Sequence, residues 1–297
     1  MRPPVRCRTA PVLRRLLLVL VLLAGTGMRA PPAGAEPALW KVVNGASTAY
    51  LYGSVHLLKP TTVWDTPKVE AALGESRELW LEITDVDDPA AMQSTVRSLG
   101  TDPAHPLTGR LDPARRKRLA AILAGFGAPP TALDTLRPWL AAVTVSLFPL
   151  QKAGYDPAAG VDRLLKAAAV KRGLPVMGFE TSASQLHYLS DMSETEQMDM
   201  LHQSIDDYDT ALSELDQLEA AWERGDDAEI ARLEARDMTP ALYQRLLAGR
   251  NVLFARRLVE RMQQPGVIFV AVGAAHLAGP DSVQVLLARA GLKAVRQ

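Results

Sequence analysis

Cysteine is nearly absent from this sequence, since Cys7 is the only one among 297 residues. Because Cys7 falls in an expected signal peptide, the mature chain should contain no disulfide and no thiolate ligand. Any metal ion would therefore be bound by His and carboxylate side chains. The sequence also lacks a P-loop, a Gly-x-Ser-x-Gly elbow, a His-Glu-x-x-His motif and a dinucleotide-binding fingerprint. The enzyme classes that depend on those motifs are therefore not indicated.

Apolar runs long enough to cross a membrane are also lacking. Leu16 to Ala24 (LLLVLVLLA) is too short to span a bilayer, follows several Arg residues and precedes Ala33-Gly34-Ala35, an A-x-A cleavage signal. We expect a secretory signal peptide over residues 1–35 that is cut after Ala35. The mature protein, residues 36–297, would then be periplasmic or secreted and not held in a membrane. The alternative is an uncleaved membrane anchor.

An excess of positive charge is missing from the expected mature chain. Residues 1–35 hold six Arg and no acid, which leaves 27 basic against 33 acidic side chains and a net charge of −6. This balance argues against a nucleic-acid partner and against an anionic membrane surface. The remaining 262 residues are enough for one large domain or two small ones.

Hydrophobic patterns predict strands near both ends of the chain and helices between them. Leu39 to Val43 and Thr48 to Val55 flank an Asn44-Gly45 turn signal, which predicts a hairpin with a loop longer than the tight form. Further strands are predicted over Glu78 to Thr84, over Pro175 to Phe179 as a buried strand, and over the apolar run that begins at Val267. We predict an α/β fold in which the N- and C-terminal strand-bearing ends form one mixed sheet, with a large central helical portion inserted.

Capping signals and apolar spacing indicate where the helices lie. Helix starts are predicted at Thr66-Pro67, at Asp112-Pro113, at Thr131 with Asp134, and at Ser193 with Glu196. Apolar residues recur every three or four positions from Leu201 to Trp222, which predicts one continuous helical face. This face would pack on the body of the protein or, as the alternative, form the seam of a homodimer.

Two strand ends carry the same Gly-x-x-His motif. One apolar strand ends in Gly53-x-x-His56, and the apolar run from Val267 ends in Gly273-x-x-His276. Open α/β sheets place their sites at the carboxyl ends of buried strands. We therefore expect the two imidazoles to lie over one crevice and to begin a metal site. The alternative is a pair of hydrogen-bonded structural His residues.

Glu82 is the expected third ligand. It lies in a strand otherwise fit for burial, where a carboxylate is unfavourable unless it is paired or bound to a cation. Two imidazoles and a carboxylate suit a divalent Mn, Fe, Co or Zn ion, and a bound water would become a nucleophile near neutral pH. The alternative is a solvent-facing Glu on a half-exposed strand.

Glu180 and Arg250 are the expected catalytic residues. Glu180 follows a short predicted strand and would act as general base or as a further ligand, with Gln185 one turn on in support. Its alternative is an acid placed at a helix N-terminus. Arg250, beside Asn251 in a helical run, would bring a guanidinium to a carbonyl oxygen or orient a carboxylate ligand. Its alternative is an exposed Arg near a helix interruption.

Six motifs, in this order along the chain, resemble the TraB/PrgY/GumN family: Leu39-Trp40-Lys41-Val42, Leu51 to His56, Leu79-Trp80-Leu81-Glu82, Gly178-Phe179-Glu180-Thr181 with Gln185, Arg250-Asn251, and Val272 to Leu277. That family is similar to the Tiki proteins, which are metal-dependent proteases, and to the fold shared by erythromycin esterase and haem-binding ChaN. In Tiki, two Gly-x-x-His motifs and an acid are implicated in metal-dependent cleavage. The resemblance thus implies metal ligation by His56, Glu82 and His276.

The sequence therefore predicts an exported metal-dependent hydrolase, a peptidase in the first instance, acting on a peptide or small-molecule substrate. The alternative is a non-catalytic periplasmic binding protein for a peptide signal or haem. A third possible class is a structural protein that binds a partner through its long helices.

Overall fold

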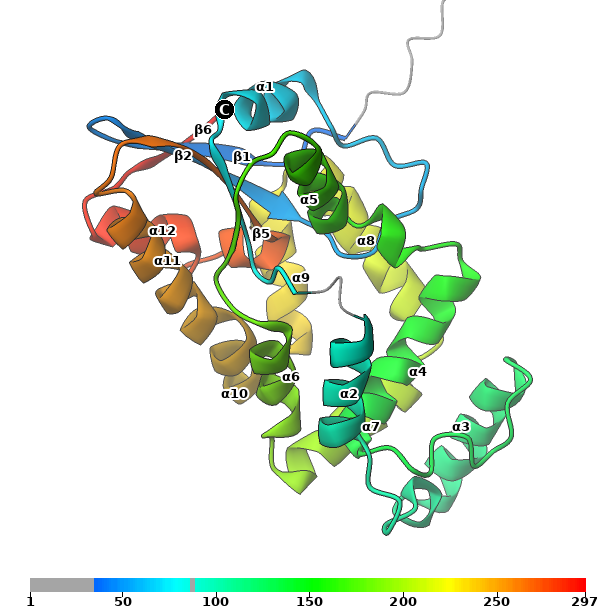
Figure 1. Ribbon diagram of the computed structural model, residues 1–297. Coiled ribbons are helices and arrows are strands. Elements are labelled where there is room, and N and C mark those ends of the chain that lie inside the picture. The colour runs from blue at the N-terminus through cyan, green and yellow to red at the C-terminus, as the bar shows by residue number, and fades with distance from the viewer. Residues whose placement is uncertain (1–34, 86–88) are drawn as a thin grey trace, which may run out of the picture. The chain divides into compact units, whose positions relative to one another are not determined.

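The computed structural model describes residues 35–85 and 89–297 (Figure 1). The expected signal peptide, apart from Ala35, thus lies outside the described residues. None of the helices in the two described ranges is long and apolar enough to cross a membrane.

One mixed sheet joins the two ends of the chain. Within the described ranges its six strands are β1 Leu39–Asn44, β2 Ser47–Ser54, β3 Glu78–Leu81, β4 Val176–Gly178, β5 Gly266–Gly273 and β6 Ala294–Arg296. They lie in the order β4-β3-β5-β2-β1-β6. Neighbours from β4 to β2 are parallel, whereas β1 runs antiparallel to both β2 and β6. The predicted α/β fold with a mixed sheet is confirmed.

The hairpin at the start of the sheet is tighter than predicted. Asn44 pairs directly with Ser47, so only Gly45 and Ala46 form the loop. Gly45 adopts a φ of +57°, which a two-residue hairpin turn of this kind requires and which a residue without Cβ adopts readily. The Asn44 side chain also donates to the backbone oxygen of Met262 over 3.0 Å, which fixes the turn against the body.

Two of the predicted strands are shorter in the structure. β3 ends at Leu81, so Glu82 lies just beyond the strand and not within it. β4 covers only Val176–Gly178, and it is half-exposed where burial was predicted, with Met177 43% accessible. The reason is that β4 is an edge strand, which pairs with β3 alone among the strands that the structure describes.

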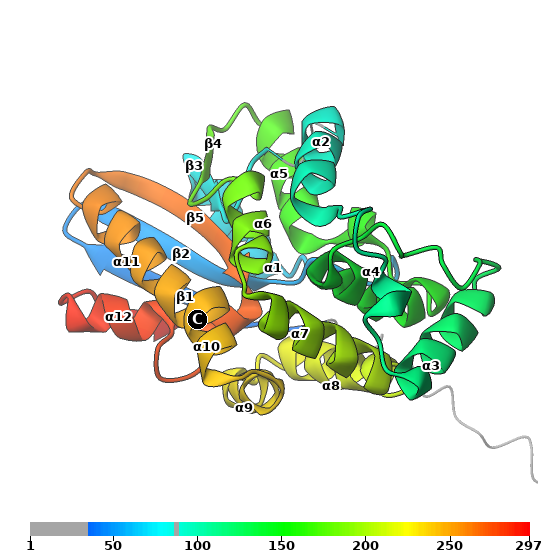
Figure 2. The same ribbon diagram turned by 90° about the horizontal axis from the view of Figure 1, so that it is seen from below.

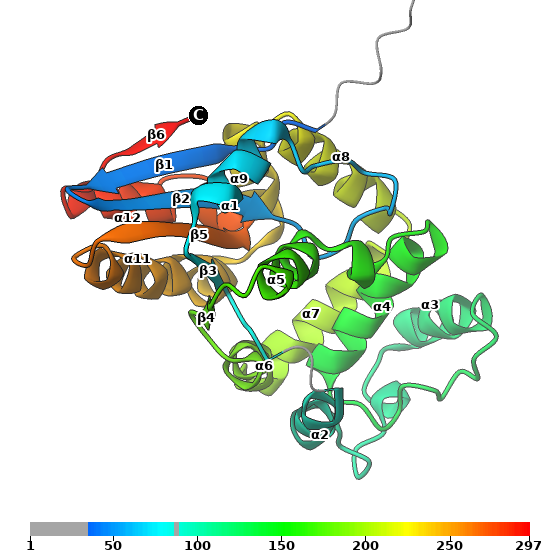
Figure 3. The same ribbon diagram turned by 45° about the horizontal axis from the view of Figure 1, so that its top comes forward.

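Helices cover both faces of the sheet and extend beyond it. In the described ranges they are α1 Pro67–Glu75, α2 Pro89–Gly100, α3 Pro113–Ala124, α4 Pro138–Lys152, α5 Val161–Lys171, α6 Ser182–Ser190, α7 Glu194–Asp206, α8 Ala211–Glu223, α9 Asp227–Asp237, α10 Pro240–Tyr243, α11 Gly249–Arg261 and α12 Val283–Arg289. α11 and α12 pack on one face through Phe254, Leu258 and Leu287 (Figure 2). α1, α5, α9 and the end of α8 pack on the other face (Figure 3).

A separate cluster of buried residues joins α3, α4 and α7 away from the sheet. The helix predicted after Thr131 begins later, at Pro138, because Arg137 is extended, as a residue before proline prefers (φ −66°, ψ 153°). The predicted caps at Thr66, Asp112 and Ser193 are confirmed.

The continuous apolar face predicted from Leu201 to Trp222 is divided between α7 and α8. The C-terminal end of a helix carries negative partial charge, and α7 ends at three acidic residues, Asp206, Asp207 and Asp209. Their negative charges disfavour continuation of this helix. Leu201 then packs in the α3–α4–α7 cluster, and Trp222 packs under the sheet. Both residues are therefore buried inside the chain.

Candidate functional site

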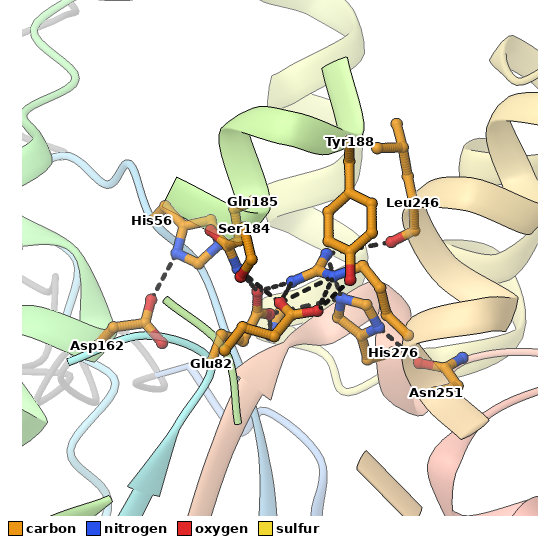
Figure 4. A network of polar contacts seen from close by, with 12 residues as sticks. His56, Glu82, Asp162, Ser184, Gln185, Tyr188, Leu246, Asn251 and His276 are labelled. Carbon is orange, nitrogen blue, oxygen red and sulfur yellow. Dashed lines mark hydrogen bonds and ion pairs between the residues drawn. The ribbon is translucent and has the colours of Figure 1, made fainter. Parts of the chain in front are cut away.

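The residues that directly follow four parallel strands lie at the same edge of the sheet. β4, β3, β5 and β2 are consecutive in the sheet and all point the same way. Glu180 follows β4, Glu82 follows β3, His276 follows β5 and His56 follows β2. These are four of the five residues that the sequence predicts for the site, and Arg250 reaches them from α11. Figure 4 shows the resulting network of polar contacts.

The two Gly-x-x-His strand ends meet next to each other. Ser54 of β2 pairs with Gly273 of β5, so the motifs are offset by one residue. A Cβ added at Gly273 would lie 3.1 Å from Oε1 of Glu82, 3.6 Å from Cδ2 of His276 and 3.9 Å from Nε2 of His56. Those two His atoms are therefore no more than about 7.5 Å apart, the sum of their distances from that point. Gly273 leaves open the space on which the three side chains converge.

Glu82 is buried and fully paired. Its side chain is 5% exposed, which rules out the solvent-facing alternative. Oε1 accepts from the backbone N–H of Gly273 over 2.7 Å, and Oε2 accepts from Gln185 Nε2 over 2.9 Å and Arg250 Nη2 over 2.5 Å. Burial raises the pKa of Glu82, but the neighbouring His276, Arg250 and His56 and the Gly273 N–H lower it by more, to about 2.

Arg250 supplies the cation of the site. Its side chain is 11% exposed, which rules out the exposed alternative. Nη2 donates to Glu82 and, over 2.8 Å, to Glu180; Nε donates to both oxygens of Glu180 over 3.1 Å. Nη1 donates to Nε2 of His276 over 3.1 Å. One guanidinium thus joins two carboxylates and an imidazole.

A π-helical turn precedes Arg250. It spans Gln244–Ala248, directly before α11, and brings the Gln244 carbonyl oxygen to Gly249. A Cβ at Gly249 would lie 2.9 Å from that oxygen, so the turn needs a residue without a side chain here. Arg250 Nη1 also donates to the Leu246 oxygen within the turn over 3.1 Å. Such turns are frequent at functional sites, and this one fixes the start of α11 and hence Arg250.

Glu180 is held by three side chains. Besides Arg250, it accepts from Tyr188 Oη over 2.9 Å and from Gln185 Nε2 over 3.1 Å. Its side chain is 2% exposed. The sequence predicts Gln185 as a support of Glu180, and the same amide also donates to Glu82. Thr181 is the residue that caps α6, so Glu180 is not needed at the N-terminus of this helix. Its side chain binds Arg250, Tyr188 and Gln185 in the site instead.

His276 is a neutral acceptor. Its Nδ1–H donates to Oδ1 of Asn251 over 2.5 Å, and the Asn251 amide is itself oriented because its Nδ2 donates to the Asp281 oxygen. The lone pair of Nε2 therefore faces Arg250. Burial lowers the pKa of His276, Glu82 opposes this and Arg250 adds to it, and the pKa falls to about 4.

His56 is the exposed member of the site, with 64% of its side chain accessible. Its Nδ1 is 2.6 Å from Oδ2 of Asp162, which leaves Nε2 as the nitrogen nearest Gly273. The surrounding chain disfavours the charged ring, but the hydrogen bond and charge of Asp162 raise the pKa of His56 to about 9.

Sequence reasoning missed Asp162 and Tyr188. Asp162 lies in the first turn of α5, and nothing in the sequence relates it to His56. Tyr188 had a usable signal, because it lies three residues after Gln185 on α6 and so shares its face. Asn251 belongs to a predicted motif, but its bond to His276 was not predicted.

The donor chemistry of this site suits a divalent metal. Each imidazole has an oxygen acceptor at Nδ1, which is how proteins orient the Nε2 of a metal-binding His. Within residues 35–85 and 89–297, however, no three His, Cys, Asp or Glu side chains are grouped so that they could hold an ion. Arg250 instead donates to two of the expected donor atoms, Glu82 Oε2 and His276 Nε2. The residues fit a metal as donors, and Arg250 must release His276 for all of them to bind one.

The neutral His276 makes the stability of the metal-free protein depend on pH. Its pKa of about 4 lies below the ordinary value of 6.5. Between pH 6.5 and pH 4, His276 therefore binds a proton in the unfolded chain but not in the folded chain. The free energy of unfolding should therefore fall, by up to about 3 kcal/mol, as pH drops from 6.5 to 4. Urea unfolding at a series of pH values measures this slope.

A matched pair of variants identifies the residue that causes this dependence on pH. His276→Gln should remove it, whereas His105→Gln, on the surface, should retain it. An unchanged slope in His276→Gln would show that other groups cause the acid sensitivity.

The fold and site define a class: an α/β protein with a buried Glu–Glu–Arg–His cluster at the carboxyl ends of its parallel strands. A family model described as the TraB/PrgY/gumN family matches residues 38–296. The chain belongs to the TraB/PrgY/gumN family, as its motifs predict. Comparisons with curated proteins and with solved structures give no match.

Proposed function

We propose that this protein is an exported, metal-dependent hydrolase that cleaves peptide bonds. The convergence of His56, Glu82 and His276 beside Gly273 is the observation that supports it. We propose these three residues as ligands of a divalent Mn, Fe, Co or Zn ion. When bound, the ion would polarise a carbonyl group and activate water. The resemblance to metal-dependent proteases and the expected signal peptide favour the same function.

Arg250 and Glu180 have linked roles in this proposal. In the metal-free site Arg250 compensates the charges of Glu82 and Glu180. Once it releases His276, its guanidinium can stabilise the negative charge that develops on a substrate carbonyl oxygen. The same movement frees an oxygen of Glu180 to accept a proton from the attacking water. Tyr188 and Gln185 keep that carboxylate in position.

Metal titration by calorimetry tests the ligand set. Metal-stripped protein should bind one Mn, Co or Zn ion, and Asp162→Asn should weaken binding by about 10–100-fold, because a neutral amide replaces the carboxylate that orients His56 and raises the basicity of its ring. Asp102→Asn is the matched control. It disrupts a similar pair, His105 Nδ1 to Asp102 Oδ2 at 2.9 Å, at the surface, and should leave the affinity unchanged.

The protein for this titration should be collected after export, with its N-terminus sequenced to establish whether it begins at Glu36. The same sample should hydrolyse peptides, lose this activity on chelation and regain it with added metal. Folded protein that binds none of these metals, or that hydrolyses peptides equally well with and without a chelator, would contradict the proposal.

A further inference from the structure

Three cavities with shared lining residues make up the cleft of the site. The first, of about 100 Å³, lies beside α5 and is lined by His56 and Glu82. A second, of about 210 Å³, is also lined by His56 and Glu82 and continues past Arg250 and His276. It shares Leu218 and Glu234 with a third, of about 280 Å³, between α8 and α9. Cavities that border the site from α5 to α8 and α9 suit an extended chain better than a compact molecule.

The α5 end of this cleft presents the exposed guanidinium of Arg163. Arg163 lines the first cavity and is exposed, and it makes no hydrogen bond or ion pair with the residues that the structure describes. Of the acids that line this cavity, Asp162 pairs with His56 and Glu82 pairs with Arg250. Lys166 lines the same cavity and donates to the Thr84 oxygen over 2.7 Å. A carboxylate is the group that this end would attract.

Apolar side chains of α8 and α9 line the other two cavities together with charged ones, since Glu234 lines both, and Glu214 and Arg236 line the third. Leu218 and Trp222 of α8 and Ile230 of α9 are the apolar residues of the second cavity. Leu215, Leu233 and Met238 continue this lining into the third cavity. An apolar side chain would be removed from water there, which is favourable in proportion to the area covered.

We infer that the cleft binds an extended polypeptide that has an acidic side chain beside Arg163 and an apolar side chain against α8 and α9, with the reacting bond between them. This inference rests on the proposed function, because it names the substrate class of the same site. Arg163 is then a specificity-determining residue: it pairs with the substrate carboxylate and takes no part in the reaction.

Fluorescence anisotropy with labelled octapeptides tests this without turnover. Each peptide has Leu at its centre and Glu, Gln or Lys two residues away, in one series before the Leu and in another after it. In one of the two series the Glu peptide should bind about tenfold tighter than the Gln peptide, with the Lys peptide weakest. Arg163→Glu should reverse that order and favour Lys.

Lys171→Glu is the matched control. It makes the same charge change on α5 but does not line the cleft, so the preference for Glu should persist. Binding that ignores peptide charge in both series, or a variant Arg163→Glu that still prefers Glu, would overturn the inference, as would no binding of any peptide. Peptide hydrolysis without charge preference would overturn this inference alone, whereas charge-selective binding without hydrolysis would support it and contradict the proposed function.

Discussion

Arg250→Met should destabilise the metal-free protein by about 3–5 kcal/mol. The substitution keeps an unbranched apolar stem but removes the guanidinium that Glu82 and Glu180 share. Removing one partner of a buried ion pair costs about this much, because it leaves buried charge uncompensated. Here two carboxylates would be left facing each other. Chemical denaturation of metal-stripped wild type and variant at pH 7 measures the difference.

Added metal separates this explanation from simple loss of packing. A divalent ion can supply the positive charge that the variant lacks, so it should stabilise Arg250→Met more than wild type. Arg256→Gln, an exposed change on the same helix, is the control and should alter stability by less than about 0.5 kcal/mol. If metal raised the stability of Arg250→Met no more than that of wild type, Arg250 and the metal would not compete for the same donors.

Glu180→Gln should lower turnover by about 10²–10⁴-fold, the usual effect of losing a general base. The amide keeps the size of the side chain but cannot accept the proton. Arg250 remains paired with Glu82, so the fold should survive and peptide binding should persist. Steady-state hydrolysis measures the loss of turnover, and the anisotropy titration with the labelled peptides checks that binding persists.

Glu78→Gln provides the matched control for Glu180→Gln. Glu78 pairs with Arg261 through two hydrogen bonds, at 2.8 and 3.1 Å, at the start of β3 and therefore at the opposite end of that strand from Glu82. The Glu78→Gln variant loses an ion pair that lies outside the site, so its turnover should be unchanged. A Glu180→Gln enzyme with unchanged turnover would contradict a role as general base and leave Glu180 a positioning residue for Arg250.

The sequence was informative about the site because its residues follow strands. A run such as Val267 to Val272 must be buried, and a parallel sheet then brings its carboxyl end beside those of its neighbours. For this reason the placement of His56, Glu180 and His276 at one edge could be predicted from the sequence, whereas Glu82 was expected within a longer strand. The fold class followed from the same pattern, since strands near both ends of the chain had to share one sheet.

Contacts between distant helices and the sheet could not be predicted in this way. Burial of Glu82 was expected to need a cation, but nothing in the sequence says that Arg250 supplies it. The Asp162 contact depends on how α5 packs against the loop after β2, which local spacing does not encode. The same limit explains why one continuous helical face was predicted from Leu201 to Trp222, because the apolar spacing across residues 207–210 is helical. Only the tertiary structure shows that α7 and α8 pack in different clusters.

The strand order also determines when the site can form during synthesis. β5 lies between β3 and β2, although both of these strands precede it by most of the chain. Until β5 emerges, β2 and β3 have no common neighbour, and His276 and the Gly273 N–H are not yet available. Pairings between such distant segments form late in folding, because a long loop must close first. A nascent or truncated chain that ends before residue 266 therefore has no assembled site, and any activity is withheld until nearly the whole chain has been made.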